Sequence, residues 1–238
     1  MITKFIKSIF PFSFKRSVKE HLGVPSLHWS LQNLKKKGFN PTQVVDIGAY
    51  EGGWTKDFLE VYPQSNILMI EAQPQKESIL KLLKNKNIDY IIALVSSDDN
   101  LEVNFYENET ASHINFSNII DLNSTKIVKT KSLNTILSEK NITYPNFLKL
   151  DVQGHEIEVL KGCLNVLANV EICLLEVTLI KLGDNDVLFT ELNNFMDAQG
   201  FQVYDITQFM RRPFDRAMYQ MDVMYIKKDS EFVNDRNW

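Results

Sequence analysis

The stretch Q-V-V-D-I-G-A-Y-E-G-G-W-T, from Gln43 to Thr55, decides the fold. It begins with closely spaced β-branched residues, which are typical of a strand that is buried on both faces. Gly48, Gly52 and Gly53 follow, and without a Cβ the chain can turn sharply there and approach a ligand closely. The stretch therefore predicts a buried strand, a glycine loop and a helix, the arrangement of a nucleotide-type binding turn.

The loop lacks the residues that hold phosphates. A dinucleotide fingerprint needs glycine where Tyr50 stands, and a P-loop needs lysine where Trp54 stands. Asp46 and Glu51 instead add negative charge, which repels a phosphate and suits a ligand with a positive charge. S-adenosylmethionine has a sulfonium, an ammonium and a carboxylate, and the carboxylate can bind at the N-terminus of the helix that begins near Trp54. The alternative is a glycine turn with a structural role only.

The composition is that of one soluble α/β domain. The chain has 238 residues, 44% of them hydrophobic and 24% charged, and its net charge of −4 gives no general attraction to nucleic acid. Cys163 and Cys173 lie in apolar patterns, which favours buried thiols in a reducing, cytoplasmic compartment over a zinc site or a disulfide. We expect an N-terminal helical arm (residues 1–40), a catalytic domain (residues 41–228) and a C-terminal tail (residues 229–238).

The first 20 residues form a basic amphipathic pattern. Apolar residues stand at helical spacing with lysines between them: Ile2, Phe5, Ile6, Ile9 and Phe10. Lys4 and Lys7 interrupt the apolar run too early for a signal peptide. Such a helix can lie on an anionic membrane surface as a peripheral contact, or it can pack on its own domain or on a second subunit of a homo-oligomer.

The segments after the glycine loop alternate between strand and helix patterns. Strands are predicted at residues 66–71 and 88–95, and helices at residues 26–39 and 54–62 and from Pro74 onward. This β-α-β-α-β order predicts a parallel sheet with a ligand crevice at the carboxyl ends of its strands. Glu71 ends the second strand, where a carboxylate can accept hydrogen bonds from both ribose hydroxyls; the alternative is a solvated strand-end acid.

Residues 101 to 131 break this rhythm. Apolar and polar residues alternate at both ends of the segment, as in antiparallel strands with one wet face, and the middle is polar. We expect a β-hairpin insertion whose loop overhangs the crevice and contacts substrate. His113 lies in this loop and is a candidate substrate residue, against the alternative of an exposed histidine.

The second half of the chain completes the sheet. Strands are predicted at residues 146–151, 170–177, 201–206 and 221–226, the last as an antiparallel strand, with helices at residues 157–168 and 187–199. Asp151 ends the first of these strands, and Glu176 lies near the end of the second. Both carboxylates should therefore lie at the crevice.

Several motifs resemble those of the FkbM family of S-adenosylmethionine-dependent methyltransferases. They are D-I-G-A-Y-E-G-G-W-T, I-E-A-Q-P at residues 70–74, L-K-L-D-V-Q-G-H-E-I-E-V-L-K-G at residues 148–162, S-L-N-T-I-L at residues 132–137 and M-D-V-M-Y-I at residues 221–226. The resemblance implies a Rossmann-like class I methyltransferase fold, a mostly parallel seven-stranded sheet with helices on both faces, and O-methylation of a sugar or another hydroxyl-bearing metabolite.

By position, the resemblance implies that Asp46, Gly48 and Glu71 bind the cofactor, and that Asp151, Gly154 and Glu156 form a second motif facing cofactor and substrate. Gln153 stands where the family commonly has Glu, and Asn134 where it commonly has Asp. Both departures weaken any inference of a metal or charge network there.

The predicted site has three parts. For proton transfer we expect Asp151 as base or metal ligand, His155 as the second candidate and Glu156 as the third. For substrate we expect His113 and Glu176. A divalent metal would need Asp151, His155 and Glu176 to converge, and we assign none. The predicted cofactor set is Asp46, Gly48, Ala49, Tyr50, Glu51, Gly52, Thr55, Glu71, Ala72, Ser97 and Asp151.

Two other functions stay open. A nicotinamide-dependent oxidoreductase shares the alternating fold, but the missing glycine at Tyr50 and the acid at Asp46 count against it. A non-catalytic nucleotide-binding module could keep the same fold, although the retained acids Asp46, Glu71 and Asp151 count against this as well.

Overall fold

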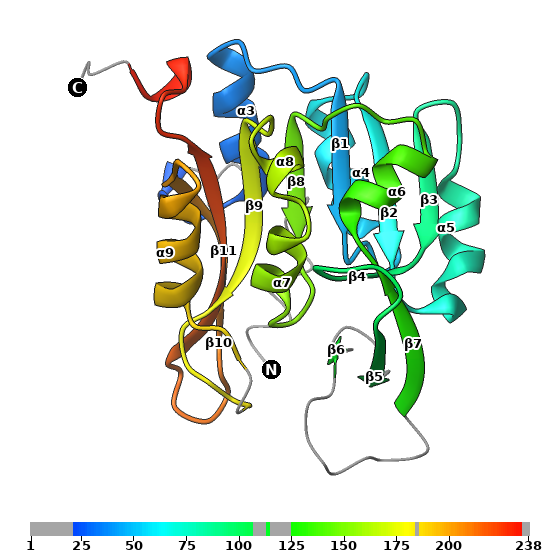
Figure 1. The fold of residues 1–238 in the computed structure, drawn as a ribbon. Helices are drawn as coiled ribbons and strands as arrows, with labels where there is room; N and C mark the ends of the chain where they lie inside the picture. The colour runs from blue at the N-terminus through cyan, green and yellow to red at the C-terminus, as the bar shows by residue number, and fades with distance from the viewer. Residues whose placement is uncertain (1–20, 107–112, 115–124, 184–185, 235–238) are drawn as a thin grey trace, which may run out of the picture.

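A seven-stranded sheet forms the centre of the molecule (Figure 1). The computed structural model describes residues 21–106, 113–114, 125–183 and 186–234. The strand order is β10-β11-β9-β8-β1-β2-β3, and only β11 runs antiparallel to its neighbours. The strands are β1 (Gln43–Ile47), β2 (Asn66–Glu71), β3 (Ile88–Ile92), β8 (Phe147–Leu150), β9 (Ile172–Thr178), β10 (Phe201–Arg211) and β11 (Met218–Lys227). The predicted Rossmann-like methyltransferase sheet is confirmed.

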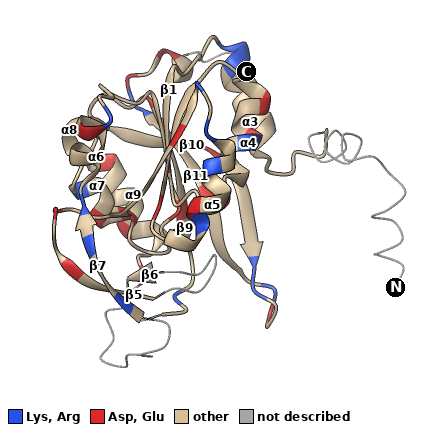
Figure 2. Ribbon diagram, turned by 90° about the vertical axis from the view of Figure 1, so that its right-hand side faces the viewer, with Lys and Arg blue, Asp and Glu red and all other residues tan. Residues whose placement is uncertain are grey.

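Helices cover both faces of this sheet, as Figure 2 shows from the side. One face carries α3 (Leu27–Lys36), α4 (Gly53–Val61) and α5 (Glu77–Leu83), and the other carries α6 (Leu133–Glu139), α7 (Glu156–Lys161), α8 (Leu164–Leu167) and α9 (Phe189–Ala198). Along β1, Val44 packs in one hydrophobic cluster, and Val45 and Ile47 pack in the other. The β-branched run that opens the strand is therefore buried from two sides, as predicted.

A smaller sheet lies beyond the carboxyl ends of β1 and β2 (Figure 1). Its order is β4-β7-β5-β6, with β4 (Leu94–Val95), β5 (Glu102–Tyr106), β6 (His113–Ile114) and β7 (Thr125–Lys131). Strands β5 and β7 pair antiparallel, which confirms the hairpin insertion. The tip of the predicted overhanging loop lies outside the described residues.

Two expected elements are divided in the structure, and one helix was not expected. The strand predicted at residues 88–95 is divided, because β2 ends at Glu71, whose carbonyl accepts from the Ala93 N–H at 2.8 Å, and β4 then pairs with β7 instead. The helix predicted at residues 157–168 breaks between α7 and α8, since Gly162 lies against the backbone of Ser96, whose oxygen would be 2.6 Å from an added Cβ. Helix α6, which Ser132 caps by accepting from the Thr135 N–H, falls in a stretch where no helix was expected.

The chain on both sides of the predicted domain packs onto it. Leu31 and Leu34 of α3 are fully buried, although they precede residue 41. At the other end, a 3-10 turn (Glu231–Val233) places the centre of the Phe232 ring 5.6 Å from the centre of the Phe39 ring. The predicted domain boundaries stay predictions, and residues 1–20 lie outside the described part of the chain. No helix among the described residues is long and apolar enough to cross a membrane.

Candidate functional site

The glycine loop joins the carboxyl ends of three strands. Gly48 has φ +75°, and a Cβ built on it would lie 1.9 Å from the backbone oxygen of Asp151 at the end of β8. Its N–H donates to the Ile70 carbonyl of β2 at 2.9 Å. Only glycine allows the chain to pass between these two neighbours. The next turn is left-handed at Tyr50, with φ 49°, and the Tyr50 N–H donates to Glu71 Oε2 at 2.7 Å.

Asp46 does not face the ligand as an unpaired charge. It is fully buried, with Oδ2 accepting from the Thr55 hydroxyl at 2.7 Å and Oδ1 3.0 Å from Lys149 Nζ. Burial alone lowers the pKa of Lys149, but the Asp46 and Asp151 carboxylates outweigh it and raise this pKa, so the ammonium stays charged. The same ammonium donates to the Gly48 carbonyl at 2.8 Å. Asp46 and Thr55 therefore stabilise the glycine loop from the core side, through hydrogen bonds and ion pairs and not through contact with a ligand.

Glu51 is also paired. Its Oε1 lies 3.0 Å from Lys76 Nζ, and this ammonium stands 3.9 Å from the centre of the Tyr50 ring. The expectation of two uncompensated negative charges in the loop is therefore wrong, because each acid has a lysine that sequence spacing did not reveal. The absence of a phosphate-binding lysine or middle glycine still separates this loop from the P-loop and dinucleotide types.

Replacing Lys149 should test the buried pair. Lys149→Met leaves the Asp46 carboxylate without its counter-ion in the core, and we expect the free energy of unfolding, measured by urea titration, to fall by ~3–5 kcal/mol. The matched control is Lys161→Met, which removes an exposed pair with Glu158 and should cost less than ~1 kcal/mol. Equal small losses in both variants would contradict this assignment.

A pocket opens at the carboxyl ends of β1, β2 and β8. Its cavity volume is about 100 Å³, and the space including the open mouth is about 660 Å³. The predicted residues that line it are Gly48, Tyr50, Glu71, Ala72, Asp151 and His155. One wall is apolar, because Leu94, Phe105 and Ile114 pack there as a small hydrophobic cluster. Phe105 and Ile114 belong to the insertion, so the small sheet completes the pocket.

Glu71 is placed to serve both the loop and a ligand. It is 4% exposed, and its two oxygens accept from the Tyr50 N–H at 2.7 Å and from the Gln73 N–H at 2.9 Å. Each carboxylate oxygen has a second lone pair, and the residue lines the pocket. The arrangement therefore fits two ribose hydroxyls.

A second loop follows β8 and faces the first. Glu156, 3% exposed, accepts with Oε1 from the N–H groups of Val152 and Gly154, both at 3.2 Å. Burial raises the pKa of Glu156 to about 7, even though these hydrogen bonds act in the opposite direction. Glu156 thus fixes the loop from behind, and it is not among the residues that line the pocket.

Stability should depend on pH through Glu156. Its pKa is raised from 4.5 to about 7 on folding, so the folded state holds the proton more tightly, and this stabilisation is lost as pH rises through that window. Against Glu156→Gln, which stays neutral, wild-type unfolding free energy should fall by up to ~3 kcal/mol between about pH 5 and about pH 8. Urea titrations at the two pH values measure it. The control Glu191→Gln, at an exposed position, keeps Glu156 and should therefore follow the same pH course as wild type. A parallel pH course for wild type and Glu156→Gln would refute the effect.

Four polar side chains meet beside the pocket. Gln153 Nε2 donates to Asp151 Oδ1 at 2.9 Å and to Glu176 Oε2 at 2.6 Å, and Gln220 Nε2 donates to the same Glu176 oxygen at 3.1 Å. Burial, followed by the charges of Asp151 and Asp222, raises the pKa of Glu176 to about 9. Glu176 therefore lies next to Asp151, but the pair is bridged through an amide.

Of the remaining predicted residues, His155 lines the pocket, whereas Ala49, Gly52 and Ser97 do not. His155 is buried, its Nε2 is 2.9 Å from the Ser96 hydroxyl, and burial lowers its pKa. Ser97 bonds to Asp98 and does not line the pocket, while Ala49 is buried in the core. Gly52 has φ +72°, and an added Cβ there would lie 2.3 Å from Leu83 Cδ1.

The structure does not test the substrate role predicted for His113. The backbone of His113, in β6, pairs with Tyr106 of β5, and the His113 side chain lies outside the described part of the chain. Among the described residues, no group of three or more His, Cys, Asp or Glu side chains is arranged to hold a metal ion.

Sequence reasoning missed Lys149, Gln73 and the apolar wall. Lys149 carried a signal, because a lysine inside the buried strand F-L-K-L requires a counter-charge. Phe105 carried a weaker one, as the last apolar residue of an alternating strand. Ile114 stands in a polar stretch and gave none.

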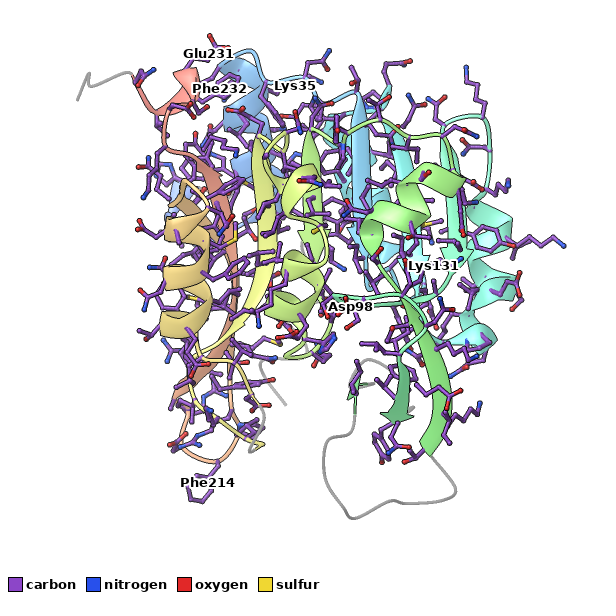
Figure 3. The ribbon with its side chains drawn as sticks, viewed as in Figure 1. Lys35, Asp98, Lys131, Phe214, Glu231 and Phe232 are labelled. Atoms are coloured by element: carbon purple, nitrogen blue, oxygen red, sulfur yellow. The ribbon has the colours of Figure 1, made fainter. Side chains whose placement is uncertain are left out.

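The small sheet and the β10–β11 hairpin both extend from the edge of the fold that holds the pocket (Figure 3). Asp98 and Lys131 lie where the small sheet joins the large one, and Phe214 lies at the tip of the β10–β11 hairpin (Figure 3). Lys35 and Phe232 lie at the opposite edge (Figure 3). Fold and site together define a Rossmann-like α/β enzyme with a nucleotide-type cofactor pocket between two strand-end loops.

Comparison with known proteins gives the family. The model of the methyltransferase FkbM domain matches residues 46–203, and the chain belongs to this family. It is therefore a methyltransferase, with S-adenosylmethionine as cofactor, and not a nicotinamide-dependent oxidoreductase. Two features fit this cofactor: the close approach of the backbone at Gly48 to the end of β8, and the second lone pair on each Glu71 oxygen, which can accept from a ribose hydroxyl.

A curated relative matches one part of the chain. The hexuronic acid methyltransferase AglP of Haloferax volcanii is 40% identical over 50 residues, which is 21% of this chain and 21% of AglP. The matched segment thus spans about a fifth of that relative.

Solved methyltransferase structures resemble the chain at low sequence identity. A precorrin-6y C5,15-methyltransferase from Geobacter metallireducens has a TM-score of 0.46 and 13% identity, covering 84% of this chain and 86% of its own. The magnesium protoporphyrin IX methyltransferase from Synechocystis has a TM-score of 0.47 and 8% identity, with 84% and 79% covered. A 1,6-didemethyltoxoflavin-N1-methyltransferase from Burkholderia thailandensis has a TM-score of 0.45 and 12% identity, and the match covers 95% of this chain and 87% of that protein.

Proposed function

We propose that this enzyme methylates a hydroxyl group of a sugar or glycan, and that it does so in the cytoplasm. The observation that carries the proposal is the position of Asp151, whose carboxylate lines the cofactor pocket and is 39% exposed. The name of AglP, a hexuronic acid methyltransferase, supports a sugar acceptor. The free, buried thiols of Cys163 and Cys173 support a reducing compartment.

Asp151 acts as the general base in this proposal. When bound, S-adenosylmethionine supplies a methyl group on a positively charged sulfur, which an acceptor oxygen can attack in line. A sugar hydroxyl is a weak nucleophile while it keeps its proton, so an Asp151 oxygen accepts that proton as the new O–C bond forms. His155 is the second candidate base, because its lowered pKa keeps the ring neutral. Holding the acceptor in line supplies the remaining advantage.

The charges around Asp151 favour a neutral acceptor group. The Asp151 carboxylate lines the pocket, burial and the charges of Asp151 and Asp222 raise the pKa of Glu176 to about 9, and no Lys or Arg is among the described residues that line the pocket. An acceptor carboxylate would be repelled there, whereas a hydroxyl can both donate to a carboxylate and accept from an amide. We therefore expect ether formation at a hydroxyl rather than esterification of a sugar acid.

Transfer of a labelled methyl group tests the proposal. Wild-type protein with methyl-labelled S-adenosylmethionine should label neutral sugars or glycans in a panel that includes nucleotide sugars, neutral glycans and hexuronic acids. Label only in a carboxyl ester would refute the hydroxyl proposal. If the panel stays silent, calorimetric titration with S-adenosylmethionine and with NAD shows why. Binding of S-adenosylmethionine means that the acceptor is missing from the panel, whereas binding of neither ligand would favour a non-catalytic module.

The contact predicted for residues 1–20, with a membrane surface or a second subunit, lies outside the described residues. It stays a prediction, as does the substrate role of His113.

A further inference from the structure

Gln153 holds an unusual position in the second loop. Its φ is 54°, a left-handed conformation that residues with a Cβ rarely adopt. Glu156 fixes the backbone on both sides of it through the Val152 and Gly154 N–H groups. The loop thus presents the Gln153 side chain between the ends of β8 and β9.

The Gln153 amide nitrogen bonds to two carboxyl groups. It lies 2.9 Å from Asp151 Oδ1 and 2.6 Å from Glu176 Oε2, and it has one hydrogen for each. Turning the amide would place its oxygen against carboxyl oxygens, so the orientation follows from the partners. On the other side of Asp151, Lys149 Nζ lies 3.7 Å from Oδ2. The Asp151 carboxylate is therefore held from two directions.

We propose that Gln153 is a positioning residue whose amide takes the place of a bridging cation between Asp151 and Glu176, so that methyl transfer here needs no divalent metal. The proposal rests on the proposed function, in which Asp151 is the base. Two carboxyl groups at hydrogen-bond distance from one point are normally joined by a cation or by donors. In this chain the donors are Gln153 and, on Glu176 alone, Gln220.

The substitution Gln153→Glu should turn this amide-bridged pair of carboxyl groups into a binding site for a divalent cation. It keeps the shape of the side chain but replaces the donor with a third carboxylate, and three carboxylates around one point are the oxygen ligands that Mg²⁺ and Mn²⁺ prefer. Gln153→Met removes the donor without adding charge. The matched control is Gln202→Glu, the same change of charge at an exposed position on β10.

Metal binding is the first measurement, and it does not depend on activity. Mn²⁺ titrated into each protein and followed by electron paramagnetic resonance should show saturable binding to Gln153→Glu. It should show none to wild type, Gln153→Met or Gln202→Glu. Saturable binding of Mn²⁺ to the wild type would overturn the proposal, as would a folded Gln153→Glu protein that binds no Mn²⁺.

Turnover with and without a chelator is the second measurement. Wild type and Gln202→Glu should keep their kcat in EDTA. Gln153→Glu should lose roughly 10- to 100-fold in kcat in EDTA, with the KM for the cofactor little changed, and regain part of it with Mn²⁺. Gln153→Met should lose kcat in both conditions, because misplacing the base acts on the chemical step. Full activity of Gln153→Met, or a wild type that EDTA inactivates and Mn²⁺ restores, would contradict the proposal.

The two proposals fail in different ways. If wild type transfers no methyl group to any hydroxyl, the proposed function fails, and the Mn²⁺ titration still decides whether the amide replaces a cation. If Gln153→Glu does not fold, the wild-type titration and the Gln153→Met protein decide it.

Discussion

Gly48→Ala should abolish measurable cofactor binding and lower the free energy of unfolding by about 3 kcal/mol or more. The substitution meets two obstacles at once. The φ of +75° disfavours any residue with a Cβ, and the new atom would lie 1.9 Å from the Asp151 backbone oxygen. The chain can relieve this clash only by separating the glycine loop from the end of β8. That movement displaces the backbone on which both the cofactor and Asp151 depend.

Calorimetry with S-adenosylmethionine and urea unfolding measure the two effects. The control is Gly53→Ala, because Gly53 is the first residue of α4 and an added Cβ there meets nothing within 4 Å. This control should bind the cofactor normally and unfold at the same or slightly higher urea concentration. Normal binding by Gly48→Ala would show that the close approach of the two loops is not required.

Asp151→Asn should keep cofactor binding and lose roughly 10²- to 10⁴-fold in kcat. The amide has the same shape as the carboxylate but cannot take a proton from the acceptor. The loss should therefore appear in the chemical step and not in the affinity for S-adenosylmethionine. Single-turnover transfer of labelled methyl, with calorimetry in parallel, separates the two.

Asp98→Asn is the control for this variant. Asp98 is exposed in the turn after β4 and does not line the pocket, so the kcat of this variant should stay within about twofold of wild type. Unchanged turnover in Asp151→Asn would remove Asp151 from the mechanism and leave His155 as the candidate base.

The sheet could be predicted from sequence because its strands are buried on both faces. Runs such as those at β1, β2 and β9 are mostly apolar, and the residues between them have helical periodicity. The same property hides where a buried strand changes partners. Residues 88–95 are apolar except for Asp89 and look like one strand, yet β3 and β4 belong to different sheets, since the partner strand β2 stops at Glu71.

The site was predictable where a residue's role depends on its place at a strand end. Gly48, Glu71 and Asp151 follow this rule, and the structure places all three on one pocket. Charge pairs cannot be predicted from position at a strand end. Lys149, which pairs with Asp46, lies about a hundred positions away from it in the chain. A sequence shows the acids of a loop, but only the fold shows which of them are neutralised.

At Ala93 the chain leaves the large sheet and enters the small one. The Ala93 N–H still donates to the Glu71 carbonyl at the end of β2, and Phe105 and Ile114 are described insertion residues that line the pocket. We therefore expect that a different insertion between residues 101 and 131 leaves the cofactor pocket intact when these two apolar positions are kept. Acceptor preference should then change with the insertion, while cofactor binding stays the same.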